Sequence, residues 1–118
     1  MEAATHEVLR EGGLEIRPAE FLALARGRPL ALTVRELSLL CALARRSGRI
    51  VSREELYAVV WGRPFRKEER SVDVYVRKLR SKLESAIPGE TFIHTHFGFG
   101  YRFAPEPSHP LHKSATGR

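Results

Sequence analysis

The stretch RSVDVYVRKLRSKL, residues 70–83, combines basic and aliphatic side chains at spacings that could bind an anion. Its basic residues are Arg70, Arg77, Lys78, Arg80 and Lys82, and Asp73 is its only acidic one. Val72, Val76, Leu79 and Leu83 follow at i, i+4, i+7 and i+11, the spacing of one helical face. The opposite face carries Arg70, Val74, Arg77, Lys78 and Ser81, while Asp73 and Arg80 lie on the flank, where they can pair with neighbours. The stretch predicts an amphipathic helix at about residues 70–85 with a cationic outer face.

Composition and charge limit the kind of protein that this helix belongs to. The chain has 118 residues, 42% of them hydrophobic, which suits one small domain. A net charge of +6 favours an anionic partner, such as nucleic acid, an acidic protein or an anionic membrane surface. Cys41 is the only cysteine, which excludes an intramolecular disulfide, and its helical spacing from Leu37 and Ala44 predicts a place in the core. No apolar run approaches the roughly 20 residues of a membrane span, so we expect a cytoplasmic protein without a membrane partner.

Turn and capping signals predict the elements that position this helix. Short apolar groups between Leu14 and Leu32 are separated by glycine and proline, which predicts a small antiparallel sheet. A capping box at residues 33–36, TVRE, then starts a helix that ends near Gly48. A second box at residues 52–55, SREE, starts a helix that we expect to turn Leu56, Val59 and Val60 inward.

The remaining segments frame the basic helix. Residues 62–69, GRPFRKEE, form a charged loop before it, and Pro88 and Gly89 end it. Residues 92–103, FIHTHFGFGYRF, are two β-prone runs around a glycine-bearing tip, which predicts a hairpin. We expect residues 1–10 to be flexible, residues 11–104 to form the domain and the proline-rich residues 105–118 to be disordered.

The predicted order is an α+β arrangement: an N-terminal antiparallel sheet, three helices and a C-terminal hairpin. A helix of about 10 to 12 Å diameter with a cationic face fits the B-DNA major groove. A neighbouring hairpin can then reach the adjacent backbone or minor groove, which is the arrangement of a winged helix-turn-helix. The sequence therefore favours binding of double-stranded DNA.

From Leu32 to Phe103 the chain resembles the effector domain of the OmpR/PhoB class of bacterial response regulators. The segments that carry the resemblance are, in order, LTVRELSLL, GRIVSREEL, VVW, RSVDVYVRKLRSKL and GFGYRF. Each is short, and their joint order and spacing are much more specific than any one of them. The resemblance implies a transcriptional regulator of a two-component system.

The resemblance also implies roles for individual residues. It places Trp61, Arg70, Ser71, Arg77, Arg80 and Tyr101 on phosphates. Asp73, Val74 and Lys78 align with positions that reach base edges, and Ser81, Thr95 and Phe97 complete the candidate contacts. Two residues keep a structural alternative: Trp61 as a core aromatic, and Tyr101 as the residue that holds the wing down.

The chain departs from the family at the tip of the hairpin. Where a Thr-Val-Arg-Gly sequence is usual, this chain has Thr95-His96-Phe97-Gly98. In the family, the arginine enters the minor groove, where narrow A·T-rich tracts concentrate negative potential. We expect Phe97 instead to fold back onto Ile93 and the wing's own core, with a wedge against a base step as the alternative.

Partners and rival functions follow from the same residues. The resemblance implies that the loop at residues 62–69 contacts RNA polymerase, and similar domains bind direct repeats as head-to-tail pairs.

The main rival to DNA binding is a protein-interaction module whose basic helix meets an acidic partner. An enzyme is disfavoured because no nucleophile-elbow or phosphate-loop spacing occurs. RNA recognition is disfavoured because neither an exposed aromatic sheet nor a GxxG clamp is present. His94 and His96 share a strand face, but two ligands do not complete a metal site, so we expect no metal and no cofactor.

Overall fold

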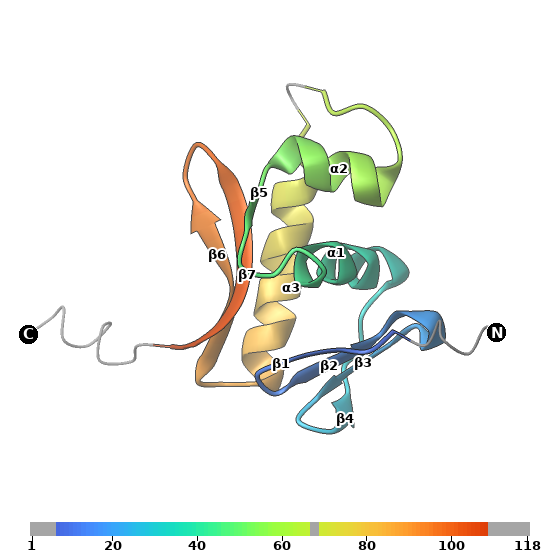
Figure 1. Cartoon of the computed structure of the whole chain (residues 1–118), viewed down its shortest axis with the longest axis vertical. Coiled ribbons are helices and arrows are strands. Elements are labelled where there is room, and N and C mark those ends of the chain that lie inside the picture. The colour runs from blue at the N-terminus through green and yellow to red at the C-terminus, as the bar shows by residue number, and fades with distance from the viewer. Residues whose placement is uncertain (1–6, 67–68, 109–118) are drawn as a thin grey trace, which may run out of the picture.

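The computed structural model describes residues 7–66 and 69–108, which fold into two small sheets and three helices (Figure 1). An N-terminal antiparallel sheet has the order β1-β2-β3-β4, formed by Leu9–Glu11, Leu14–Arg17, Leu22–Ala25 and Arg28–Pro29, with a 3-10 turn at Pro18–Glu20. The helices are α1 (Val34–Ala44), α2 (Arg53–Trp61) and α3 (Ser71–Ala86). The second sheet has the order β5-β7-β6, from Ile50–Val51, Gly100–Pro107 and Glu90–His96. The predicted α+β winged helix-turn-helix is confirmed.

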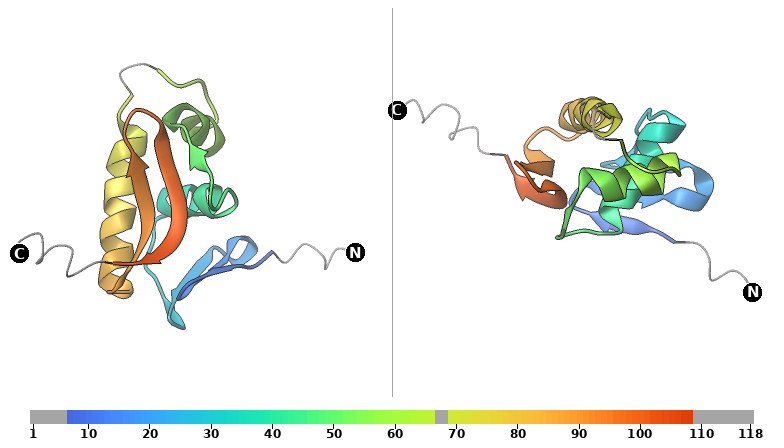
Figure 2. Two further views of the ribbon diagram at one scale, coloured as in Figure 1. Left: turned by 60° about the vertical axis from the view of Figure 1, so that its left-hand side comes forward. Right: turned by 90° about the horizontal axis from the view of Figure 1, so that it is seen from above.

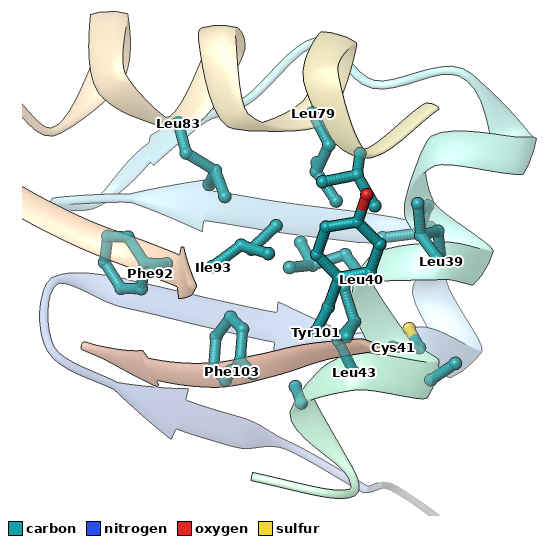
Figure 3. Packing of buried hydrophobic residues seen from close by; sticks show 14 of the residues in the cluster. Leu39, Leu40, Cys41, Leu43, Leu79, Leu83, Phe92, Ile93, Tyr101 and Phe103 are labelled. Carbon is teal, nitrogen blue, oxygen red and sulfur yellow. The ribbon is translucent and has the colours of Figure 1, made fainter. Parts of the chain in front are cut away.

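Helix α3 contacts β6 of the hairpin as well as α1 and α2, and Figure 1 shows it with the hairpin on one side and α1 on the other. Its predicted inner residues Val72, Val76, Leu79 and Leu83 are all buried. They pack with α1 and with Ile93 and Phe103 of the hairpin (Figure 3). Cys41 belongs to the same core, as predicted, and burial raises the pKa of its thiol. This core fixes α3 by its apolar face and leaves the opposite face outside.

The predicted capping box at the start of α1 is confirmed. The Glu36 N–H donates to the Thr33 hydroxyl at 3.1 Å, and the Thr33 N–H donates to the Glu36 carboxylate at 2.9 Å. The same carboxylate accepts from Lys82 of α3 at 2.7 Å, so one buried acid joins two helices. Burial alone would raise the pKa of Glu36, but the bonds from Lys82 and Thr33 outweigh it and hold the pKa below its usual value.

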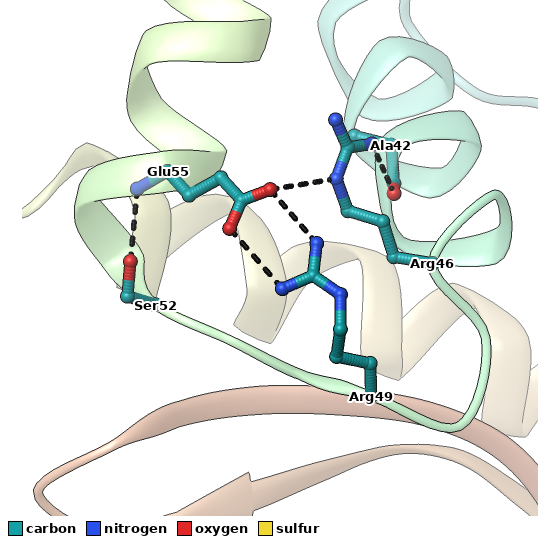
Figure 4. A network of polar contacts seen from close by, with 5 residues as sticks. All are labelled: Ala42, Arg46, Arg49, Ser52 and Glu55. Atoms are coloured by element: carbon teal, nitrogen blue, oxygen red, sulfur yellow. Dashed lines mark hydrogen bonds and ion pairs between the residues drawn. The ribbon is translucent and has the colours of Figure 1, made fainter.

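The second predicted capping box is only half formed. The Ser52 hydroxyl accepts from the Glu55 N–H at 3.0 Å, as a capping residue should. The Glu55 carboxylate, however, turns away from the Ser52 N–H and binds Arg46 at 3.0 Å and Arg49 at 2.9 Å (Figure 4). Hydrogen bonds from Arg49 and then Arg46 lower the pKa of Glu55. The expected reciprocal box was wrong because two arginines before the helix compete for the carboxylate.

Two further expectations, one about α2 and one about the N-terminal segment, need correction. Val59 is exposed, and Tyr57 instead joins Leu56 in the core, because positions 56, 57 and 60 share the inner arc of α2. Strand β1 begins at Leu9, inside the segment that we expected to be flexible.

Strand β7 continues to Pro107, three residues into the predicted tail, because Pro107 and Glu106 pair with Glu90 and Thr91. The expectations for residues 1–6 and 109–118 lie outside the described residues. Within residues 7–66 and 69–108, no helix is long and apolar enough to cross a membrane.

Candidate nucleic-acid interface

The outer face of α3 presents the cationic residues that the sequence predicted. Arg77, Lys78 and Ser81 are exposed, as is Arg70 just before the helix, and Val74 is half-buried between them. The Lys78 ammonium lies 5.1 Å from the centre of the Tyr75 ring, which is close enough for a cation–π interaction. Among the described residues, neither Arg77 nor Lys78 takes part in an ion pair. This face therefore offers uncompensated positive charge to an anion from outside.

The flank of α3 is tied to the wing. The Tyr101 hydroxyl of β7 donates to the Asp73 carboxylate at 2.6 Å, and Arg53 of α2 lies 3.7 Å from the same oxygen. Burial, followed by the hydrogen bond to Asp73, raises the pKa of Tyr101 to about 12. About two turns further along α3, the Arg80 guanidinium donates to the Thr95 hydroxyl at 2.9 Å. The structure thus brings four of the candidate residues together as two pairs that join helix to wing.

Trp61 packs in an aromatic cluster at the end of α2. Its ring stacks on Tyr57 at 5.0 Å and meets Tyr75 of α3 edge-on at 5.6 Å. The Arg35 guanidinium lies 4.9 Å from the indole on another side. Trp61 is only half-buried, so the structural role that the sequence left open is present, and its contact with phosphate stays a prediction.

The tip of the wing differs from expectation. Phe97 is 88% exposed and does not fold back onto Ile93, which is buried in the core. The last paired residues of the hairpin are His96 and Gly100, so the turn between them projects beyond the sheet, away from the core that Ile93 joins. Phe99, which the sequence reasoning did not select, is also 74% exposed. The FGFG pattern, with aromatic residues between turn-forming glycines, was the available signal.

Comparison with known proteins agrees with this geometry. Residues 27–103 match the family described as "Transcriptional regulatory protein, C terminal". The chain belongs to this family. Two structures are similar at a TM-score of 0.76 and 32% identity: the DNA-binding domain of CpxR from E. coli, and the Klebsiella pneumoniae RstA DNA-binding domain in complex with the RstA box. The alignments cover 83% and 86% of this chain, and 96% and 100% of those structures, respectively.

Curated relatives of this transcriptional regulatory family are longer than this chain. The phosphate regulon transcriptional regulatory protein PhoB of Escherichia coli is 37% identical over 103 residues, which are 86% of this chain and 44% of PhoB. SphR of Synechococcus elongatus, an alkaline phosphatase synthesis transcriptional regulatory protein, is 37% identical over 85% of this chain and 39% of its own length. The chain thus spans less than half the length of these two relatives. The resemblance to OmpR/PhoB effector domains is confirmed, and the family is one of DNA-binding transcription regulators rather than enzymes.

Within this regulatory domain, a groove separates the wing from the starts of α2 and α3. Its volume is about 750 Å³, and its walls include Arg53, Asp73, Thr95 and the exposed turn of the wing. The Arg53 Nε is buried and has no hydrogen-bond partner among the described residues. The groove therefore places one basic side chain, that of Arg53, between α3 and the wing tip, and the sequence reasoning also missed this residue.

The two histidines of the wing make contacts within the hairpin. The ring Nε2 of His94 lies 2.8 Å from the Ala104 carbonyl oxygen, as a donor would. The ring Nε2 of His96 accepts from the Arg102 guanidinium at 3.0 Å. No group of three or more histidine, cysteine, aspartate or glutamate side chains within residues 7–66 and 69–108 is arranged to hold a metal ion.

Proposed function

We propose that this domain binds specific sequences of double-stranded DNA, with α3 in the major groove and the β6–β7 hairpin as the wing, and regulates transcription as part of a bacterial response regulator. The observation that carries the proposal is the outer face of α3, which is basic, exposed and free of internal ion pairs among the described residues. The similarity of this chain to the RstA DNA-binding domain that was solved in complex with the RstA box supports the proposal that it binds DNA.

The residues of this face divide into two roles by their chemistry. Arg70 and Arg77 are exposed and contact phosphates, which orient the domain without reading sequence, whereas Ser71 is half-buried and its hydroxyl donates to Glu69 in the free domain. Lys78 and Val74 face the bases, because a lysine can donate to guanine O6 or N7 and a valine can pack on a thymine methyl.

The residues that join helix to wing have a supporting part. Asp73 is held by Tyr101 and Arg53, so its side chain reaches a cytosine N4 only at the edge of the interface. Arg80 and Thr95, already bonded to each other, contact the backbone as a pair, and Ser81 and Trp61 lie at the margins of the same surface.

Two assembly proposals extend this function. Copies of the domain pair head to tail on direct repeats, with adjacent recognition helices about one DNA turn apart so that both lie on one side of the duplex. The loop at residues 62–69 contacts RNA polymerase. Its described part supports this because Gly62, Arg63, Pro64 and Arg66 are exposed beside α3.

Selection from random duplexes, followed by affinity measurements on the best site, tests the proposal. Lys78→Ala should lower affinity for the selected site by about 1 to 3 kcal/mol and relax the base preference at one position. Arg77→Ala should weaken selected and unselected duplexes alike.

Arg10→Ala is the matched control for the loss of one positive charge. Arg10 lies in β1 of the N-terminal sheet and pairs with Glu15. If it weakens binding as much as Arg77→Ala, net charge rather than the face of α3 determines binding, and the proposal fails.

A further inference from the structure

The turn between β3 and β4 carries an arginine where the backbone favours a shorter residue. Arg26 and Gly27 form a two-residue hairpin turn, and φ is positive at both, 50° at Arg26 and 82° at Gly27. Such turns favour Asn-Gly or Asp-Gly, because a short polar side chain tolerates the left-handed conformation better than a long one. Arg26 is therefore strained, and a strained residue of this kind points to a function for its side chain.

The side chain of Arg26 reaches the end of α3. Gly13 leaves the room for it, because an added Cβ at Gly13 would lie only 3.2 Å from the Arg26 Cγ. The guanidinium then donates to the Pro88 carbonyl at 3.2 Å, just beyond α3. A guanidinium has five N–H donors, and the described residues supply no other acceptor to this one. Since Arg26 is exposed, its remaining donors are open to an anion from outside.

The position of this guanidinium extends the outer face of α3. That face begins with Arg70 and continues through Ser81 to Ser85, one turn further along the helix. Pro88 follows three residues later, and all four of these residues are exposed. The Arg26 guanidinium thus lies at the far end of the cationic face that we propose for DNA.

Arg26 and Arg28 together form a basic turn at this end of the domain. Arg28 is exposed, and neither arginine takes part in an ion pair among the described residues. The nearby Glu90 carboxylate instead accepts from the Gly13 N–H at 3.2 Å. Figures 1 and 2 show the N-terminal sheet at the end of α3 opposite to the turn of the β6–β7 hairpin. Unpaired positive charge is therefore present at both ends of α3.

The length of α3 suits contacts with both strands of a duplex. Its last residue, Ala86, lies about 14 Å along the helix axis from Arg77, at 1.5 Å per residue. The major groove of B-DNA is about 12 Å wide and has a phosphate backbone on each side. A helix that crosses the groove with Arg77 near one backbone therefore brings the basic turn to the other.

We propose that the basic turn contacts phosphates of the DNA strand opposite to the strand that Arg77 contacts. The inference rests on the proposed function, because it takes α3 to lie in the major groove. Contacts with both backbones fix the orientation of α3 in the groove without reading sequence. The N-terminal sheet is then part of the DNA interface, and it strengthens binding to every duplex.

The test uses variants that remove the charges and keep the turn. Arg26→Asn suits the left-handed conformation, and Arg28→Gln removes no contact present in the structure. The double variant Arg26→Asn/Arg28→Gln is compared with the wild type and with Arg26→Lys/Arg28→Lys, which keeps both charges. Arg10→Ala is the matched control, because it removes a cation from the same sheet that is already paired with Glu15.

Melting temperatures come first, and we expect the double variant to melt close to the wild type. Relief of the strain at position 26 offsets the lost bond to Pro88. Arg28→Gln alone repeats the binding test without any change in the turn residues 26 and 27.

Fluorescence anisotropy at several salt concentrations then measures the number of phosphate contacts. The double variant should make the slope of log affinity against log salt shallower by about 1.8, since each contact contributes about 0.9. This change should be the same on the selected site and on a duplex of arbitrary sequence. Arg28→Gln alone should change the slope by about 0.9, whereas the double lysine variant and Arg10→Ala should keep the wild-type slope.

Neutral methylphosphonates, placed one at a time in the selected site, locate the contacts. The wild type should lose affinity when either backbone beside the groove is neutralised. Arg77→Ala should become insensitive to replacements on one strand, and the double variant should become insensitive to replacements on the other.

Three results would overturn the inference. A wild-type slope in both the double variant and Arg28→Gln would show that the basic turn does not contact DNA. A change in slope as large for Arg10→Ala would make net charge the cause. Insensitivity of the double variant on the same strand as Arg77→Ala would contradict contacts with opposite strands. In each case the wild type would still bind with a salt-dependent affinity, whereas failure of the proposed function would appear as no such binding by the wild type itself.

Discussion

Removing the Tyr101 hydroxyl tests how the wing is fastened to α3. In Tyr101→Phe, the Asp73 carboxylate loses a donor at 2.6 Å, and its remaining partner among the described residues is the more distant Arg53, at 3.7 Å. A hydrogen bond to a charged acceptor contributes about 1.5 to 3 kcal/mol to stability. Because the Asp73 side chain is 32% exposed, water can replace part of the lost bond, and we expect a loss near 1.5 kcal/mol.

The assay is thermal and urea denaturation at neutral pH. For a domain of about 100 residues, this loss corresponds to a melting temperature lower by about 6 to 12 °C. Tyr75→Phe is the matched control, because Tyr75 is half-buried and its hydroxyl has no hydrogen bond among the described residues. We expect the melting temperature of Tyr75→Phe to stay close to that of the wild type. If Tyr101→Phe is as stable as Tyr75→Phe, the bond to Asp73 does not hold the wing.

Alkaline titration adds a second measurement on the same variant. Burial and the bond to Asp73 raise the pKa of Tyr101 to about 12, above its ordinary value near 10. The contribution of Tyr101 to stability is therefore fully present below pH 10 and is lost as the pH rises through about 12. The tyrosinate absorbance that is missing in Tyr101→Phe should titrate near 12, and a midpoint near 10 would contradict the buried, hydrogen-bonded hydroxyl.

The same variant also tests the assignment of Tyr101 to a phosphate. A hydroxyl has one proton to donate, and here it goes to Asp73. Tyr101→Phe should therefore change affinity for arbitrary duplex by less than about threefold once the protein is folded, whereas a lost phosphate contact would weaken every duplex more strongly.

Three further perturbations test the fold that supports the site. Leu79→Ala leaves a cavity at a fully buried position on the inner face of α3 and should lower the free energy of unfolding in urea by about 2 to 5 kcal/mol. A loss below about 1 kcal/mol would show that α3 does not pack on the core through this face. Gly100→Ala should destabilise the domain strongly, because φ is +142° and an added Cβ would meet the Val51 carbonyl. Gly98→Ala has open space around it and should cost only backbone strain of about 1 to 3 kcal/mol. Equal melting temperatures of these two variants would contradict this packing of β5 against β7. Lys82→Gln should lower the free energy of unfolding at pH 7 by roughly 1 kcal/mol or less. This difference from the wild type should shrink as the pH falls below about 4.5, because Glu36, whose pKa is lowered in the folded protein, then becomes protonated. A difference that does not depend on pH would mean that the Lys82–Glu36 ion pair contributes nothing to stability.

The sequence predicted most of the fold because its signals are local and periodic. The spacing from Val72 to Leu83 identified the buried face of α3, and the Thr33–Glu36 pair located the start of α1. Both depend on residues within a few positions of one another. The limits of the strands were harder to predict, because they depend on partners far along the chain. The end of β7 is an example, since Glu106 and Pro107 pair with residues of β6.

The misses in the candidate site share a physical cause. Glu55 was assigned to Ser52 by the pattern of a capping box, yet arginines at positions 46 and 49 lie close enough in space to take its carboxylate. Phe97 was expected to fold back onto the wing's core rather than to wedge into a duplex at the cost of bending it, but a turn that projects beyond its sheet offers no core to join. Competition between partners and the reach of a turn are properties of the folded chain, which periodicity does not encode.

The central claim is that α3 presents its cationic face to the phosphates and bases of a duplex, and the salt dependence of binding tests it most directly. Fluorescence anisotropy would follow the wild type on a duplex of arbitrary sequence and on an acidic polypeptide of equal charge, over a range of salt concentrations. If three to five basic side chains neutralise phosphates, log affinity for the duplex should fall linearly with log salt with a slope of about −2.7 to −4.5. The selected site should keep a large advantage over arbitrary duplex at every salt concentration. A slope near zero, or binding to the acidic polypeptide as tight as to the selected site, would contradict the account and favour a protein-interaction module.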